Sequence, residues 1–110
     1  MQIRKTYKDV NPELLYDEVR DFIGKRGAVL GEAKLETYAL PGGSSHIVRG
    51  TLIFQSETEK ECLRAHIVGS AKDETKVILD INEALFPQEN VTALQQDLDF
   101  IFGSDETKQH

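Results

Sequence analysis

The side chains best suited to chemistry in this chain of 110 residues are an imidazole and a carboxylate, those of His66 and Asp80. An aspartate beside a histidine orients the imidazole and raises its basicity, as a general base requires. The strand pairing derived below places both in one row across a sheet, together with Glu36 and Thr51. No nucleophile with an oxyanion hole accompanies them, and an open sheet face does not exclude water. Catalysis by His66 and Asp80 is therefore our third functional hypothesis, and a solvated cross-strand pair is the simpler interpretation.

The same row is also the candidate for a metal site. The carboxylates of Asp80 and Glu36 and the imidazole of His66 are ligands that suit zinc or iron. The three histidines of the chain follow neither the HxH nor the HExxH spacing. Ligands spread over separate strands of a flat face disfavour such a site, so we predict no metal and no cofactor.

The only cysteine, Cys62, stands at the start of a predicted strand. The alternation places it on the outer face of the sheet, beside Glu61 and opposite Gln55. A reactive thiol needs an electropositive and partly enclosed setting, so we predict an inert thiol. One cysteine builds neither a disulfide framework nor a cysteine-based zinc site. It fits a reducing compartment, and we expect a cytoplasmic protein.

Composition narrows the class of protein further. Thirteen basic and 19 acidic residues give a net charge of −6, which argues against a nucleic-acid-binding surface. No apolar run approaches the ~18 residues of a membrane span, so we expect no membrane partner, and residues 1–10 lack the apolar segment of a secretory signal.

We predict a single domain over residues 1–103. A disordered tail is predicted over 104–110, which holds no large apolar side chain.

Hydrophobic periodicity predicts the elements that must position these side chains. Alternation with a period of two predicts strands over 2–8, 29–40, 46–56, 61–70 and 76–82. Helical spacing predicts helices over 12–25 and 90–102. The connectors at 41–45, 57–60 and 71–75 are short and turn-like, so their strands should pair antiparallel. The predicted fold class is α+β: a two-layer sandwich of order β-α-β-β-β-β-α, with an antiparallel meander sheet and two helices on one face.

The pairing register follows from the need for one consistently apolar sheet face. The predicted pairs are Phe54 with Leu63, Leu52 with Ala65, Ile67 with Leu79, and Leu35 with Leu52. They place three rows on the outer face: Glu36, Thr51, His66 and Asp80; Tyr38, Arg49, Val68 and Ile78; Lys34, Ile53, Arg64 and Asn82.

The outer face of the predicted sheet is the basis of our first functional hypothesis. It carries more aliphatic residues than a solvated face usually does: Leu30, Leu40, Ile47, Ile53, Val68 and Ile78. Tyrosine and arginine are favoured at interfaces, and Tyr38 and Arg49 are expected beside Val68 and Ile78. We predict that these four residues form the interface of an interaction or scaffolding domain, in a homodimer or with a protein partner. In a two-fold dimer, Arg49 of one copy would meet Glu36 of the other.

The element order over residues 2–102 resembles a shortened helix-grip domain, the architecture of the Bet v 1 and START-like lipid-binding proteins. In that family a long C-terminal helix lies across an antiparallel sheet, and a pocket opens between them. The resemblance implies a small apolar ligand between the sheet and residues 90–102, which is our second functional hypothesis. Small residues on the predicted inner face would leave room for it: Ala33, Thr37, Ala39, Gly50 and Ala65.

Overall fold

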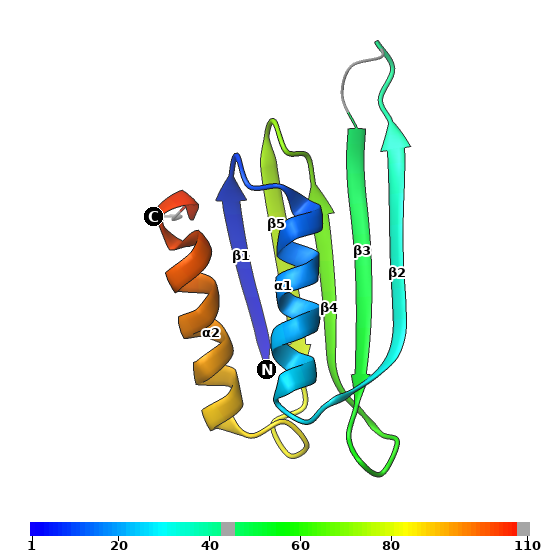
Figure 1. Cartoon of the computed structure of the whole chain (residues 1–110), viewed down its shortest axis with the longest axis vertical. Coiled ribbons are helices and arrows are strands. Elements are labelled where there is room, and N and C mark those ends of the chain that lie inside the picture. The colour runs from blue at the N-terminus through cyan, green and yellow to red at the C-terminus, as the bar shows by residue number, and fades with distance from the viewer. Residues whose placement is uncertain (43–45, 108–110) are drawn as a thin grey trace.

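The computed structural model describes residues 1–42 and 46–107, which form two layers, a five-stranded antiparallel sheet and two helices on one of its faces (Figure 1). The elements are β1 (Gln2–Lys8), α1 (Pro12–Lys25), β2 (Val29–Ala39), β3 (His46–Gln55), β4 (Glu61–Gly69), β5 (Glu74–Ile81) and α2 (Gln88–Phe102). The strand order is β1-β5-β4-β3-β2, so β1 and β2 are the two edges of the sheet. The predicted α+β class is confirmed. Part of the predicted turn over 41–45 lies outside the described residues, and so does His110.

α1 begins where its start signals predict. The side chain of Asn11 accepts a hydrogen bond from the backbone N–H of Glu13 at 2.9 Å, which satisfies one of the free donors of the first turn. Leu15, Val19 and Ile23 are buried, as the helical spacing predicts. Leu14, which was expected in the same stripe, is 60% exposed because its position in the helix points away from the sheet.

α2 begins at Gln88, two residues before its predicted start, and its N-terminal cap is Pro87. Leu94 and Leu98 are fully buried on its inner side, whereas Ile101 is exposed, although it was predicted in the buried stripe. No helix in the described part of the chain is long and apolar enough to cross a membrane.

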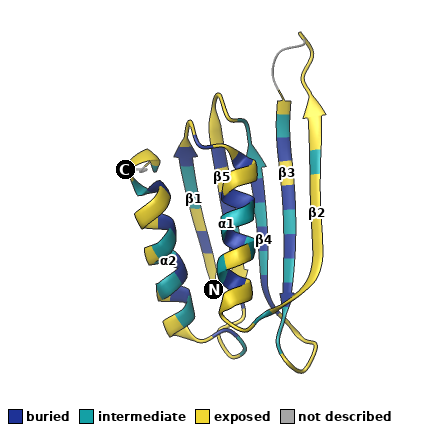
Figure 2. Ribbon diagram, viewed as in Figure 1, coloured by how far each residue is buried: buried dark blue, intermediate teal, exposed yellow. Residues whose placement is uncertain are grey.

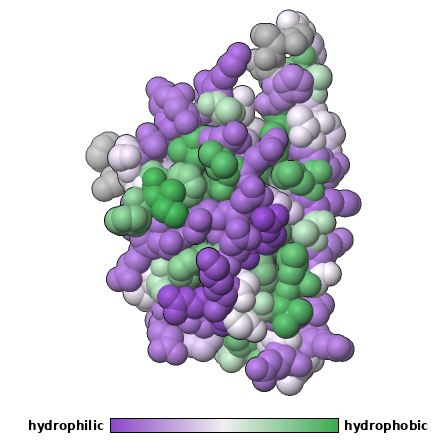
Figure 3. Space-filling view, viewed as in Figure 1, coloured by the Kyte–Doolittle hydropathy of each residue, from purple (hydrophilic) through white to green (hydrophobic). Residues whose placement is uncertain are grey.

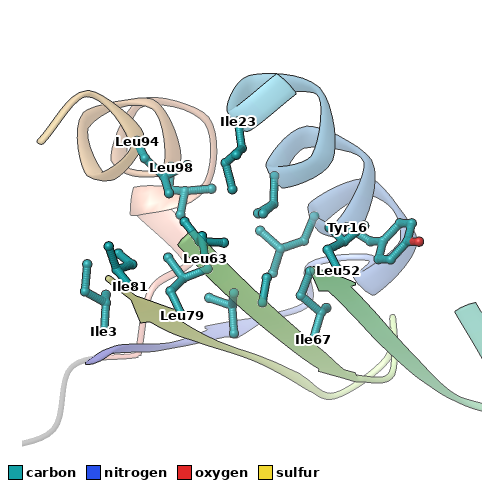
Figure 4. Packing of buried hydrophobic residues seen from close by; sticks show 14 of the residues in the cluster. Ile3, Tyr16, Ile23, Leu52, Leu63, Ile67, Leu79, Ile81, Leu94 and Leu98 are labelled. Carbon is teal, nitrogen blue, oxygen red and sulfur yellow. The ribbon is translucent and has the colours of Figure 1, made fainter. Parts of the chain in front are cut away.

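The buried core lies between the two helices and four of the five strands (Figure 2). Packed helices lie ~8–10 Å apart and neighbouring strands ~4.8 Å apart, so two helices cover about four strands. The strand that is left over is β2, and all but one of its residues are exposed. Figure 4 shows side chains from both helices meeting those of the covered strands, with these residues labelled: Ile3, Tyr16, Ile23, Leu52, Leu63, Ile67, Leu79, Ile81, Leu94 and Leu98.

The strand pairing confirms one predicted register and corrects two. The β3–β4 hairpin pairs as predicted, with Phe54 opposite Leu63. In the β4–β5 hairpin, Ile67 faces Val77 and not Leu79, so this predicted register is wrong by two residues. The cause is a tight turn, in which the N–H of Ser70 bonds to the carbonyl of Glu74 at 3.3 Å. As a result, β5 begins two residues earlier than predicted.

The β2–β3 hairpin shows the same kind of difference. Leu52 faces Ala33 rather than Leu35, so this predicted register is also wrong by two residues. A shift of two keeps each side chain on its predicted face of the sheet, and therefore the hydrophobic pattern does not distinguish the two registers. The length of the connection between the strands decides between them.

Two β-bulges move residues to a face that simple alternation does not predict. A bulge leaves Cys62 between the pairs Phe54–Leu63 and Gln55–Glu61, so its thiol lies in the core and not on the outer face. Burial raises the pKa of the Cys62 thiol, which keeps it protonated and unreactive. A second bulge in β2 brings Leu30 opposite Phe54, on the inner face instead of the predicted outer one.

The described residues after α2, 103–107, return to the edge strand β1. Gly103–Asp105 form a 3-10 turn, and Glu106 makes a β-bridge with Tyr7. The backbone N–H of Thr107 bonds to the carbonyl of Thr6 at 2.7 Å. Residues 104–107 therefore pack against β1 and do not form the predicted tail, whereas 108–110 lie outside the described residues.

Candidate interaction surface

The row predicted for acid–base catalysis does not form. His66 lies opposite Ile78 on β5, whereas Asp80 lies opposite Arg64. Asp80 also accepts a hydrogen bond from the side-chain amide of Gln2 at 2.8 Å. The two-residue shift in the β4–β5 register separates the imidazole from the carboxylate, so their predicted juxtaposition is wrong.

The third residue of the predicted metal site is also in a different row. Glu36 lies opposite Arg49 and accepts a hydrogen bond from the hydroxyl of Tyr38. His66, Asp80 and Glu36 thus belong to three successive rows of the outer face. Over residues 1–42 and 46–107, no three His, Cys, Asp or Glu side chains are grouped to hold a metal ion.

The four predicted interface residues share the outer face but not a single row. Arg49 lies opposite Val68, as predicted. Tyr38 lies opposite Ile47, one row away on one side, and Ile78 lies one row away on the other side. Tyr38 and Arg49 are exposed, while Val68 and Ile78 are half-buried. The four residues form a diagonal band across the outer face, and its role in binding stays a prediction.

A partly buried ionic cluster at the β1 edge was not predicted. The side chain of Lys5 is only 13% exposed, and its ammonium lies 3.1 Å from the carboxylates of both Asp99 and Glu106. Burial acts to lower the pKa of Lys5, but the hydrogen bonds to the two carboxylates outweigh it and raise the pKa above its ordinary value. The alternation of Ile3, Lys5 and Tyr7 could have indicated this cluster, because it places the lysine on the apolar face of the sheet, where a charge needs partners.

Tyr7 closes the same edge. Its side chain is fully buried, and its ring centroid lies 5.8 Å from that of Phe102. The hydroxyl has no hydrogen-bond partner among the described residues. Burial raises the pKa of Tyr7, and the nearby negative charges of Glu106 and Asp99 add to this effect. The phenol therefore stays neutral, and the cluster packs the C-terminal segment onto β1 without presenting an open site.

The two helices meet at a pair of carboxyl groups. The hydrogen bond between the side chains of Glu18 on α1 and Asp97 on α2, together with burial, raises the pKa of Glu18 to about 7. Oδ2 of Asp97 is buried without a partner in the described part of the chain. A proton held by Glu18 would supply a donor to Asp97, so we expect the contact between the helices to depend on pH.

The inner face of β2 is the part of the sheet's helix side that the two helices leave most exposed. We call the residues of β2 that face the helix side the bare strip: Leu30, Ala33, Leu35, Thr37 and Ala39. Among the described residues nine large apolar side chains are exposed, and five of them belong to 29–40: Val29, Leu30, Leu35, Tyr38 and Leu40. Figure 3 shows hydrophobic groups on this face over the β2 side of the sheet. Exposed apolar surface concentrated on one element is typical of a binding site.

Tyr16 marks the border between the covered sheet and the bare strip (Figure 4). Its ring lies so close to Gly50 of β3 that a Cβ at Gly50 would come within 2.5 Å of a ring carbon. Gly50 is opposite Leu35, the next residue outward, which is 45% exposed. A missing side chain on β3 thus lets α1 approach the sheet, and the cover ends there.

Two hollows lie at the end of the hairpin where β2 ends and β3 begins, one on each face of the sheet. The inner one, of about 410 Å³, is lined in part by Pro12, Thr37 and Val48. The outer one, of about 480 Å³, is lined in part by Ile47 and Val68. The bare strip and the predicted outer interface therefore adjoin the same end of the molecule.

Comparison of the chain with protein-family models, curated proteins and solved structures gives no match. The resemblance to helix-grip domains accordingly rests on element order alone. The surfaces of the molecule are the remaining guide to function.

Proposed function

We propose that this protein is an interaction domain that binds a protein partner along β2. The observation that carries the proposal is the exposure of this strand, which is 11 residues long, over both of its faces. Tyr38 of β2, Arg49 of β3 and Val68 of β4 lie on the outer face of the sheet and belong to the proposed surface. The single cysteine fits a reducing compartment, and we include a cytoplasmic location in the proposal.

The backbone of β2 supports this function as much as its side chains do. β2 pairs with β3 on one side and with no described strand on the other, so its outer N–H and C=O groups are free. An extended segment of a partner can add to such an edge, because main-chain hydrogen bonds provide affinity and alternate side chains provide specificity. Leu30 and Leu35 would supply apolar contacts on the inner side of the added strand.

Site-specific photo-crosslinking tests the proposal. A photoreactive residue replaces Thr37 on the bare strip in one variant and Thr92 on the exposed side of α2 in a matched control. We expect Thr37 to crosslink to a protein and Thr92 not to do so. An excess of unlabelled wild-type protein should suppress the product, whereas an excess of Leu35→Lys should not. Equal crosslinking from both positions would contradict the proposal.

The alternative of a small apolar ligand under α2 is less well supported. Its predicted position is occupied by the fully buried side chains of Leu94, Leu98 and Leu79. Ligand binding there stays a prediction. Uptake of a fatty acid or an apolar dye without unfolding, with NMR shifts confined to α2 and the facing strands, would support it.

A further inference from the structure

We propose that the partner of β2 is a second copy of this chain, paired antiparallel with β2 through a two-fold axis at Leu35 to form a continuous ten-stranded sheet. This inference rests on the proposed function, because it names the partner for the same surface. It uses the free edge of β2 and the alternating charges of residues 32–36.

Symmetry restricts the ways in which two β2 strands can pair. A two-fold axis perpendicular to the sheet joins equal edges antiparallel and keeps the inner faces of both copies on the same side. Side chains then match face to face only if a residue pairs with its own copy at the axis. From Glu32 to Ala39 the even-numbered residues face outward and the odd-numbered ones inward. The axis therefore passes through one residue of this segment.

Charge decides among the possible axis residues. An axis at Lys34 places Lys34 opposite itself and Glu32 opposite Glu36, so all charged pairs repel. An axis at Glu36 places two glutamates opposite each other. Like charges directly opposite each other in a sheet are destabilising, and opposite charges are stabilising.

An axis at Leu35 satisfies both faces. Lys34 lies opposite Glu36 of the other copy, twice by symmetry, and no like-charged pair is formed. On the inner face Leu35 meets Leu35, and Ala33 meets Thr37. The bulge at Gly31 lies beyond the outermost pair of Glu32 with Tyr38, whereas an axis at Ala33 would extend across the bulge. Residues 32–38 can therefore pair without distortion.

The opposite edge of the sheet does not offer the same arrangement. The backbone N–H of Thr107 already donates to the carbonyl of Thr6 in β1, and Glu106 forms a β-bridge with Tyr7. In addition, Lys5 is held between the carboxylates of Asp99 and Glu106. β2 is the edge with free backbone groups and self-complementary charges.

Single cysteines on the bare strip test the register directly. In the proposed register, residue 35 meets its own copy at a Cα separation of about 4.5–5.5 Å, within reach of a disulfide. Residue 33 lies about 13 Å along the strands from its own copy but opposite residue 37. We expect Leu35→Cys to form disulfide dimers under mild oxidation. Ala33→Cys and Thr37→Cys should stay monomeric alone and form a heterodimer when mixed.

The three cysteine positions, 33, 35 and 37, control for one another. All three replaced residues lie on the bare strip, so the fold should tolerate the changes, and the wild type, with its buried Cys62, reports the background. Rapid crosslinking of Ala33→Cys alone would overturn the register at Leu35. Absence of crosslinking from every position and mixture would overturn self-pairing.

Charge reversal gives an independent test by sedimentation equilibrium. Lys34→Glu alone and Glu36→Lys alone each create like-charged pairs, and we expect self-association about tenfold weaker than in the wild type. A mixture of the two variants restores two opposite-charge pairs and should associate about as tightly as the wild type. Glu36→Lys also places a second positive charge opposite Arg49 of its own chain, but this repulsion is the same alone and in the mixture. A mixture no tighter than its components would overturn the inference.

The outcomes separate this inference from the proposed function. If Thr37 photo-crosslinks to a different protein while the cysteine variants stay monomeric, the surface binds a partner and self-pairing is wrong. If neither experiment yields a product along β2, both proposals are wrong.

Discussion

The two edges of the sheet differ in how completely the rest of the chain covers them. β1 is seven residues long, lies under α2, and has its free backbone partly occupied by Glu106 and Thr107. β2 is 11 residues long, is left largely uncovered by the helices, and exposes apolar side chains on both faces. The chain thus places its C-terminal segment on one edge and leaves the other open.

This difference indicates where binding can be separated from stability. A residue on the covered part of the sheet contributes mainly to the free energy of unfolding, because its removal leaves a cavity. A residue on the bare strip makes fewer contacts within its own chain, so its removal should change association more than folding. The variants below test this contrast between the two edges.

The largest effect is expected at Phe54, on the covered side of the inner face. The side chain is fully buried, so Phe54→Ala should lower the free energy of unfolding by about 3–5 kcal/mol. Leu35→Ala on the bare strip is the matched control and should cost less than about 1 kcal/mol. Urea unfolding of both variants measures the difference. Equal losses at the two positions would remove the distinction between covered and bare strands.

Gly50 tests the border of the helical cover. Gly50→Ala brings a Cβ within 2.5 Å of the Tyr16 ring, so it should force α1 outward and cost about 1–3 kcal/mol. At Gly31 the nearest atoms belong to the movable end of the Gln55 side chain, so Gly31→Ala should cost less. In a Tyr16→Ala background the penalty at Gly50 should shrink markedly, as thermal melts of the double variant would show. If Gly50→Ala costs as much stability in that background, its cost does not arise from a clash with the Tyr16 ring.

The contact between the helices should make the cover sensitive to pH. Glu18 ordinarily titrates near 4.5 but has a pKa of about 7 in the folded protein. Between these values the folded protein holds a proton that the unfolded chain has lost, so stability from this group declines as pH rises from about 4.5 to about 7. Because solvent screens the partly exposed pair, we expect a change of about 1 kcal/mol.

Glu18→Gln removes the titration while keeping a hydrogen-bond donor beside Asp97. The variant should therefore show a flatter stability profile across this pH range than the wild type and should be the more stable of the two at pH 8. Glu13→Gln, five residues earlier in the same helix, is the control and should leave the slope unchanged. If the wild-type slope persists in Glu18→Gln, the pH dependence of stability arises from other groups.

The smallest effect is expected at the β1 edge. Glu106→Gln removes one of the two carboxylates on Lys5, while Asp99 retains the other bond, so the loss should be about 0.5 kcal/mol. Added salt should reduce the difference from the wild type. Guanidinium is unsuitable for this measurement because it is itself a salt, so urea melts at two salt concentrations serve. A loss as large as that at Phe54 would mean that the C-terminal segment is part of the core.

The elements, their order and the faces of most strand residues could be predicted from the sequence alone. Alternation and helical spacing depend on which side of an element is buried, and burial is a property that side-chain type reports directly. The pairing of Phe54 with Leu63 could be predicted for this reason. The N-terminal cap at Asn11 could be predicted because it is a local feature of the sequence.

The register of the outer hairpins, the positions of the bulges and the extent of the helical cover depend on the tertiary structure. Registers two residues apart leave the same faces buried, so the pattern could not separate His66 from the row of Asp80. The bulge that turns Cys62 inward likewise depends on how the two paired strands fit together. β2 carries as regular an alternation as its neighbours, yet it remains bare because two helices are wide enough for only about four strands.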